Sequence, residues 1–95
     1  SNAPPNMKIE VEVGDFDELK QAVAAKVDII MLDNMSPEEI VKAVKMVKKK
    51  ALIEASGGID LVNVVDVAKT GVDIVSIGAL THSARAVDIA MTLNS

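Results

Sequence analysis

The sequence of 95 residues contains no cysteine, tryptophan or tyrosine, one phenylalanine and one histidine. Without cysteine the chain can form no disulfide, zinc–thiolate site or thiol nucleophile. His82 is the only histidine, so we expect no acyl-transfer triad in this chain. The near absence of aromatic side chains removes the stacking platforms on which single-stranded nucleic acids bind. The groups that remain to form a functional site are carboxylates, hydroxyls, lysine amines and backbone N–H and C=O groups.

Positive charge is also scarce, since 10 Lys and Arg residues stand against 14 Asp and Glu residues and the net charge is −4. A general binder of the phosphate backbone is therefore not expected. The run Lys48–Lys50 leaves a nucleic-acid patch open, but its place at a predicted helix end favours solvated lysines that suit the helix dipole. No apolar run approaches the roughly 20 residues that span a bilayer, and no signal peptide is visible. We expect a cytoplasmic protein without nucleic-acid or membrane partners.

The length predicts one small domain with a modest core. Ser1–Ala3 resembles the remnant of a cleaved expression tag, and with Pro4 and Pro5 it predicts that residues 1–7 are a lead-in to a domain at 8–95. Hydrophobic residues make up 49% of the chain. Because nearly all of them are aliphatic, the composition favours parallel strands covered by helices.

Strand-like and helix-like patterns alternate along the chain. The second helix has the clearest signals, with Ser36 and Glu39 at capping-box spacing and Pro37 at the first helical position. Gly71 provides a stop signal after the third helix. The strand patterns recur about every 20 to 23 residues, which is the length of a strand–helix unit. The predicted strands are 8–13, 27–32, 51–55 and 72–77, and the predicted helices are 15–25, 36–50, 60–69 and a fourth from about Thr81.

This alternation predicts the α/β class, with four βα units, parallel strands and right-handed crossovers. Each strand has one apolar face and one face that becomes polar or small toward its carboxyl end. In the third strand, for example, Ala51, Ile53 and Ala55 lie opposite Glu54 and other residues of the second face. An open, doubly wound sheet would need two apolar faces. The pattern therefore favours half of a β/α (TIM-like) barrel whose site lies at the carboxyl ends of the strands.

The residues at these strand ends predict a phosphate site. Glycine lets the backbone approach a ligand closely, and the helix that follows each loop adds N–H donors and partial positive charge. Carboxylates on the same face would hold ribose hydroxyls or a magnesium ion carried by a polyphosphate. The carboxylates are Glu12, Asp33 and Glu54, and the loop residues are Ser56, Gly57, Gly58 and Gly78.

Simpler roles remain open for each of these residues. Gly57 and Gly58 can form only a tight turn, and Asp33 with Asn34 can serve only as turn residues before a helix. The glutamates can be solvated charges on an open sheet face. His82 can lie at the surface or contact a phosphate or ribose. A metal site formed by the three carboxylates is possible, but their spacing is not specific.

The segments KIEVEV, VDIIMLDNMSPEEI, LIEASGGI and GVDIVSIGALTHSARAVDI together resemble the quinolinate phosphoribosyltransferase family from residue 8 to about 92. This family is also called nicotinate-nucleotide pyrophosphorylase (carboxylating). The resemblance implies a barrel enzyme of NAD biosynthesis that converts quinolinate and phosphoribosyl pyrophosphate, with Mg²⁺, into nicotinate mononucleotide, CO₂ and pyrophosphate. It implies that Glu12 and Asp33 bind the ribose or its magnesium. It further implies that Ser56, Gly57, Gly58 and Gly78 bind the phosphate. Glu54 and His82 would line the same mouth of the barrel, at the carboxyl ends of the strands.

Two departures from the family bear on function. Family members are roughly three times longer, and the cationic residues that grip quinolinate belong to the parts that have no counterpart here. We therefore expect this chain to be inactive alone and, because four parallel strands leave open edges and a bare face, to form a homo-oligomer. Lys26 stands where the family tends to have glycine, which costs about 1 kcal/mol if that position needs a positive φ.

Other interpretations of the sequence also remain open. The chain can be a non-catalytic, self-assembling half barrel, or part of another phosphate-binding β/α-barrel enzyme of amino-acid biosynthesis. A molybdenum-associated relative of the transferases would look similar in this region.

Overall fold

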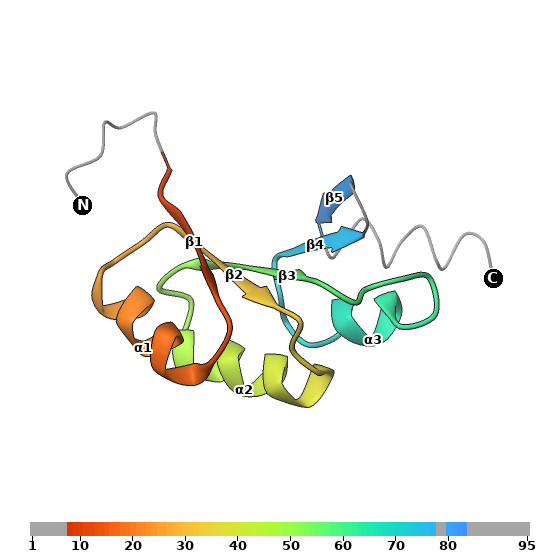
Figure 1. Ribbon diagram of the computed structural model, residues 1–95, viewed down its shortest axis with the longest axis horizontal. Helices are drawn as coiled ribbons and strands as arrows, with labels where there is room; N and C mark the ends of the chain where they lie inside the picture. The colour runs from red at the N-terminus through yellow and green to blue at the C-terminus, as the bar shows by residue number, and fades with distance from the viewer. Residues whose placement is uncertain (1–7, 78–79, 84–95) are drawn as a thin grey trace.

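Strands and helices alternate along the chain, and the helices α1, α2 and α3 all lie on one face of a five-stranded sheet (Figure 1). The computed structural model describes residues 8–77 and 80–83. Within this part of the chain no helix is long and apolar enough to cross a membrane. The elements are β1 Glu10–Val13, α1 Phe16–Ala24, β2 Ile29–Asp33, α2 Pro37–Val47, β3 Leu52–Ser56, α3 Val64–Ala68, β4 Ile74–Ile77 and β5 Leu80–Ser83.

The first four strands are parallel and lie in chain order, which confirms the predicted βα architecture. In the register of β2 and β3, Met31 pairs with Glu54 and Asp33 pairs with Ser56. Parallel order brings the carboxyl ends of the strands to the same edge of the sheet. The loops that follow β2 and β3 therefore lie next to each other at this edge.

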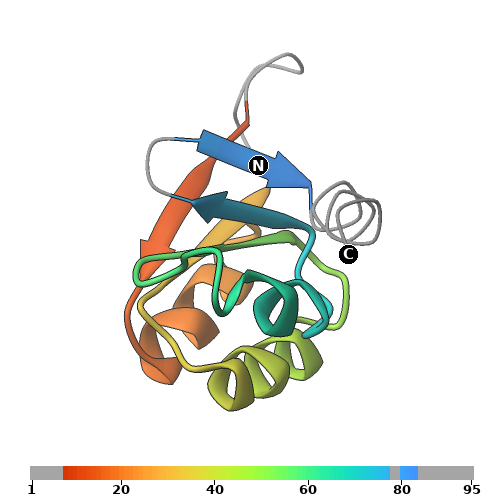
Figure 2. The same cartoon turned by 90° about the vertical axis from the view of Figure 1, so that its right-hand side faces the viewer.

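The core lies between the helices and the helix-facing side of the sheet (Figure 2). The predicted alternation is confirmed, since Ile53 and Ala55 of β3 are buried under the helices while Leu52 is 44% exposed on the other side. The uncovered face of the sheet therefore carries the strand residues of the opposite parity. The largest side chains that are fully buried are Leu19, Ile30, Leu32, Ile40, Val47, Val64 and Val75.

The helix ends follow the local sequence signals closely. Ser36 and Glu39 form both bonds of the predicted capping box at the start of α2. Asp15 caps α1 by accepting a hydrogen bond from the Glu18 N–H at 2.8 Å. Lys26, which follows α1, has a φ of 58°. The condition stated for this position is thus met, and a lysine adopts the positive φ at a cost of about 1 kcal/mol relative to glycine.

Three predicted helices differ in the structure. The second ends at Val47 rather than at 50, and Lys48 and Lys49 beyond it have positive φ values of 53° and 62°. The third begins at Val64 rather than at 60, because Asp60 and Asn63 instead hold the preceding residues in a hydrogen-bonded turn. The prediction of a helix from Thr81 is wrong for residues 81–83, which belong to β5. β5 pairs antiparallel with β4, and this pairing satisfies backbone groups that β4 would otherwise leave open at the sheet edge.

The repeated tripeptide Val-Asp-Ile marks the amino ends of β2 and β4. Asp28 Oδ2 accepts a hydrogen bond from the Ile9 N–H at 2.7 Å, and Asp73 Oδ2 accepts one from the Ile53 N–H at 2.9 Å. Each aspartate thus ties the start of its own strand to the start of the preceding strand in the sheet. The repeat therefore has a structural role at the amino edge of the sheet.

Candidate functional site

Four of the predicted site residues, Asp33, Ser56, Gly57 and Gly58, lie where the segments that follow β2 and β3 contact each other at the carboxyl edge of the sheet. The Asn34 N–H, just after β2, donates a hydrogen bond to the Ser56 carbonyl at the end of β3, at 2.8 Å. Asn34 has a φ of 57°, which lets the chain turn at once into the loop before α2. The structure therefore brings Asp33 next to the Ser56–Gly58 segment, as the sequence predicts.

The two glycines of this segment are required by the neighbouring loop. Gly57 and Gly58 have φ values of 81° and 70°, and both values strain any residue with a side chain. A Cβ atom on Gly57 would lie 2.8 Å from Asp33 Oδ1 and 3.0 Å from the Asn34 nitrogen, and one on Gly58 would lie 3.1 Å from Asn34 Oδ1. The glycines thus allow a close approach of backbone and carboxylate, which is also what a phosphate-binding loop needs.

A hydrogen-bonded turn after the glycines holds their position. The Asn63 side-chain amide donates to the Gly58 carbonyl at 2.8 Å, and Asn63 Oδ1 accepts from the Asp60 N–H at 2.9 Å. Asp60 Oδ1 in turn accepts from the Val62 and Asn63 N–H groups at 2.8 and 3.1 Å. These two residues were missed as site-supporting residues, although an Asp and an Asn three apart after a glycine pair are typical of a side-chain-stabilised turn.

Glu54 is the most buried of the three predicted carboxylates, with 7% of its surface exposed. Its Oε2 atom accepts a hydrogen bond from the Ser76 hydroxyl of β4 at 2.7 Å. Glu10 of β1 approaches it from the other side and, although exposed overall, has a raised pKa. Partial burial is the largest cause of this pKa rise, followed by the Glu54 charge and a side-chain hydrogen bond with Glu54. A polar connection thus crosses the uncovered face from β1 through β3 to β4.

Glu12 and Asp33 are exposed and lie on neighbouring strands. Glu12 is in register with Met31, so Asp33 lies two residues further toward the carboxyl edge. Within residues 8–77 and 80–83, no group of three Asp, Glu, His or Cys side chains is arranged to hold a metal ion. A pair of carboxylates still suits Mg²⁺, because this ion commonly binds one or two carboxylates together with substrate phosphates and water.

The two remaining predicted contacts are Gly78 and His82. Gly78 lies outside the described residues. His82 belongs to β5, where it is in register with Val75 of β4.

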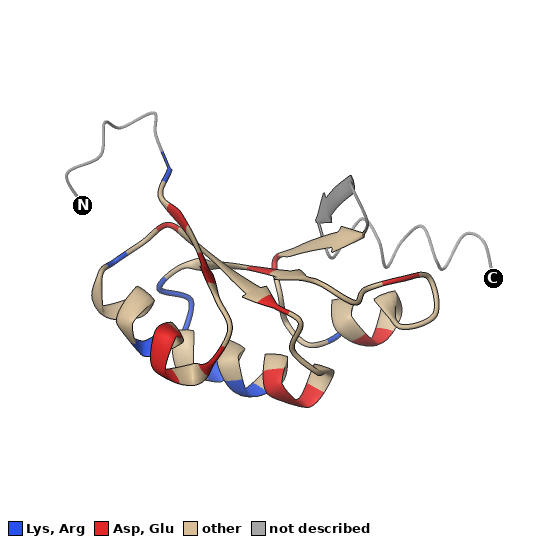
Figure 3. Cartoon of the chain, viewed as in Figure 1, with Lys and Arg blue, Asp and Glu red and all other residues tan. Residues whose placement is uncertain are grey.

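The charged residues of β1 to β4 are all acidic, and the lysines of the described chain lie on helices and connecting segments (Figure 3). The uncovered face is therefore electronegative, in agreement with the sequence analysis. Such a face suits hydroxyl groups and hydrated or bound cations. It does not suit a dicarboxylate substrate.

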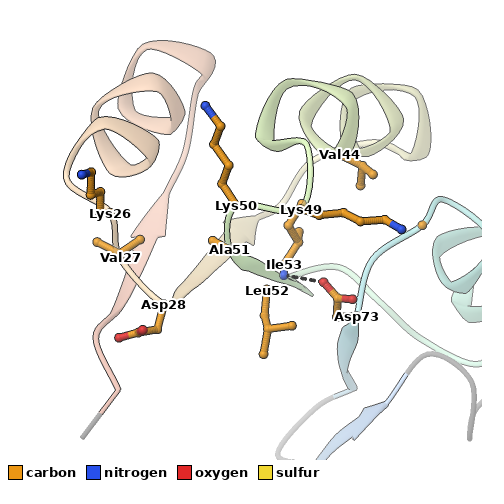
Figure 4. A pocket seen from close by; sticks show the side chains of 11 residues that line it. Lys26, Val27, Asp28, Val44, Lys49, Lys50, Ala51, Leu52, Ile53 and Asp73 are labelled. Atoms are coloured by element: carbon orange, nitrogen blue, oxygen red, sulfur yellow. Dashed lines mark hydrogen bonds between the residues drawn. The ribbon is translucent and has the colours of Figure 1, made fainter. Parts of the chain in front are cut away.

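A cavity of about 580 Å³ lies at the opposite edge, around the amino ends of β2, β3 and β4. Lys26, Lys49 and Lys50 line it together with Asp28 and Asp73 (Figure 4). Both aspartates already bind backbone N–H groups of the sheet. The carboxyl end of α2 also lies nearby and carries partial negative charge, which disfavours an anion. The glycine loops at the carboxyl edge are therefore the better candidate for a phosphate site.

Comparison with known proteins identifies the family of the chain. A model of the family described as quinolinate phosphoribosyl transferase, C-terminal domain, matches residues 1–92. The chain belongs to the quinolinate phosphoribosyltransferase family. It is 46% identical over 93 residues to a probable nicotinate-nucleotide pyrophosphorylase [carboxylating] of Methanocaldococcus jannaschii, covering 90% of this chain and 33% of that protein. It is 39% identical over 90 residues to the Rattus norvegicus nicotinate-nucleotide pyrophosphorylase [carboxylating], covering 92% of this chain and 30% of that protein.

Solved structures of nicotinate-nucleotide pyrophosphorylase and of NadC show the same fold. The nicotinate-nucleotide pyrophosphorylase from Francisella tularensis superposes with a TM-score of 0.73 at 54% identity, covering 78% of this chain and 26% of that one. A NadC deletion mutant superposes with a TM-score of 0.75 at 44% identity, covering 85% of this chain and 28% of that one. The chain thus spans about a third of the length of its curated relatives.

Proposed function

We propose that this chain is the phosphate- and ribose-binding part of an enzyme that transfers the phosphoribosyl group of phosphoribosyl pyrophosphate to quinolinate. The products are nicotinate mononucleotide, CO₂ and pyrophosphate, and the reaction belongs to cytoplasmic NAD biosynthesis. The observation that carries the proposal is the contact between the Asp33–Asn34 loop and the Ser56–Gly58 loop at the carboxyl edge. Membership of the family and the names of its relatives support the same reaction.

Different site residues bind different parts of phosphoribosyl pyrophosphate. Ser56, Gly57 and Gly58, with Gly78, bind the phosphate through close backbone approach and hydroxyl donation. Glu12 and Asp33 accept hydrogen bonds from ribose hydroxyls or hold Mg²⁺, which when bound would neutralise the charge of the pyrophosphate group. Glu54 lies on the same face, and His82 is proposed to be near the phosphate.

The acidic face also suits the chemistry at the sugar. When pyrophosphate leaves the ribose carbon, positive charge develops on the sugar, as it does in glycoside hydrolysis. Carboxylates fixed near that charge stabilise it. Quinolinate carries two carboxylates and needs cationic partners, which β1 to β4 do not provide. The chain alone should therefore bind phosphoribosyl pyrophosphate without catalysing the transfer.

Calorimetric titration with phosphoribosyl pyrophosphate and Mg²⁺, combined with a turnover assay that adds quinolinate, tests this function. We expect binding of the donor without formation of nicotinate mononucleotide. The variant Asp33→Asn keeps the shape of the side chain and should bind the donor about tenfold more weakly, because a hydrogen bond to a charged group contributes about 1.5 kcal/mol or more. Turnover by the chain alone, or no binding of the donor, would contradict the proposal.

We further propose that the chain forms a homo-oligomer through the uncovered face of the sheet. This face exposes Leu52 beside partly buried Ile29, Met31 and Ile74. Among the described strands, β1 has a neighbour on one side only. An open edge and an apolar face favour association with a second copy. Light scattering over a concentration series tests this, and a monomer throughout the series would refute it.

A further inference from the structure

Glu54 is a buried carboxylate, and strands β1 to β4 provide no cationic side chain beside it. Its surface is 7% exposed, and β1 to β4 carry no lysine or arginine. Burial of a carboxylate is costly unless hydrogen bonds or opposite charges compensate for it. Within these strands, the partners of Glu54 are the Ser76 hydroxyl and the Glu10 carboxyl.

The position of Glu54 relates it to the glycine loop. Glu54 precedes Ser56 by two residues on the same face of β3, so the two lie about 7 Å apart along the strand. That separation is comparable with the reach from a 5′-phosphate to the hydroxyls of its own ribose. A phosphate on the glycine loop would therefore place sugar hydroxyls within range of the Glu54 carboxylate.

The Ser76 hydroxyl fixes one oxygen of that carboxylate. It donates to Glu54 Oε2 at 2.7 Å from the neighbouring strand, and Ser76 is itself partly buried. A glutamate side chain has several rotatable bonds, and a bond of this kind to a rigid strand lowers the entropy lost when a ligand binds.

We propose that Ser76 is a positioning residue for ligand binding: it holds Glu54 as an acceptor for the sugar hydroxyls of a ligand whose phosphate occupies the glycine loop. The inference rests on the proposed phosphate site. Ser76 itself contacts no ligand and acts through Glu54. Its role is to make the site prefer a sugar phosphate over free phosphate.

Titration calorimetry with two probes, ribose 5-phosphate and inorganic phosphate, tests the proposal on the wild-type chain and on Ser76→Ala and Ser76→Thr. We expect Ser76→Ala to weaken ribose 5-phosphate binding about tenfold, which is typical for loss of a hydrogen bond to a charged group, and to leave phosphate binding unchanged. Ser76→Thr keeps the hydroxyl and should restore most of the affinity. Should Ser76→Ala fail to fold, Glu54→Gln is expected to show the same selective loss.

The outcomes separate this inference from the proposed function. Equal weakening of both probes by Ser76→Ala would assign Ser76 a merely structural role and overturn the inference, as would unchanged binding of ribose 5-phosphate. In both cases phosphate binding by the wild type would still support the proposed site. Failure of the wild type to bind either probe would overturn the proposed site and the inference together.

Discussion

Gly57 is the residue on which the geometry of the glycine loop depends most directly. Its φ of 81° and the close approach of Asp33 Oδ1 and the Asn34 nitrogen leave no room for a Cβ atom. Gly14 offers a matched comparison, because a Cβ atom there would meet only Glu18 Oε1, at 3.4 Å. The structure thus requires glycine at position 57 but has room for a side chain at position 14.

We predict that Gly57→Ala lowers the free energy of unfolding by about 2 kcal/mol, since backbone strain and overlap act together. Gly14→Ala should change it by no more than about 0.5 kcal/mol. Urea denaturation of both variants measures the difference. Equal stability of the two variants would mean that the loop at Gly57 can rearrange without cost.

Some features of the candidate site could be predicted from the sequence, and others could not. The carboxylates and glycines at the strand ends could be identified because strand alternation fixes their face and their edge. The side-chain partners of Glu54 could not be identified, because Ser76 and Glu10 come from other strands. The aspartates Asp28 and Asp73 were likewise unrecognised, since their partners lie about 20 residues away.

Signals in the local sequence predict the start of a helix better than they predict a strand that forms by pairing at a sheet edge. The second helix was predicted from Ser36, Pro37 and Glu39, and α2 has the expected start and cap. The third helix begins later than expected because Asp60 and Asn63 form a turn instead. β5 could not be predicted from its own residues, because it forms by pairing with the edge of β4.

The cap of α2 provides a test at the scale of a single element. Ser36→Ala removes the acceptor for the Glu39 N–H, a bond of 3.2 Å, and should destabilise the chain by about 1 kcal/mol. Ser36→Thr retains the hydroxyl and serves as the control, with a smaller expected loss. Thermal and urea denaturation of the two variants should give the same order. A stability of Ser36→Ala equal to that of the wild type would show that another group caps the helix.

Across the part of the molecule that the structure describes, the helices cover one face of the sheet and leave the other open (Figures 1 and 2). The open face carries both apolar side chains and the carboxylates Glu10, Glu12 and Glu54. Association of two such faces buries apolar surface but brings like charges together. Because salt screens exposed charges, the proposed homo-oligomer should become more stable as ionic strength rises.

A pair of variants tests whether this face mediates association. Leu52→Gln changes a residue of the open face that is 44% exposed, whereas Leu61→Gln changes one that is 75% exposed on the turn before α3. We expect the first variant to lower the mass measured by light scattering at high salt and the second to leave it unchanged. The opposite order would place the contact at the turn instead of the sheet.

The proposed function depends on the binding of phosphate at the carboxyl edge of the sheet, on the glycine loop. Backbone amide chemical shifts recorded by NMR during titration with inorganic phosphate test it most directly, because they report on both edges in one experiment. We predict that the largest saturable shifts occur at Gly57 and Gly58, with little change at Lys49 and Lys50 in the opposite cavity. Shifts confined to those lysines, or unchanged glycine amides at high phosphate concentration, would contradict it.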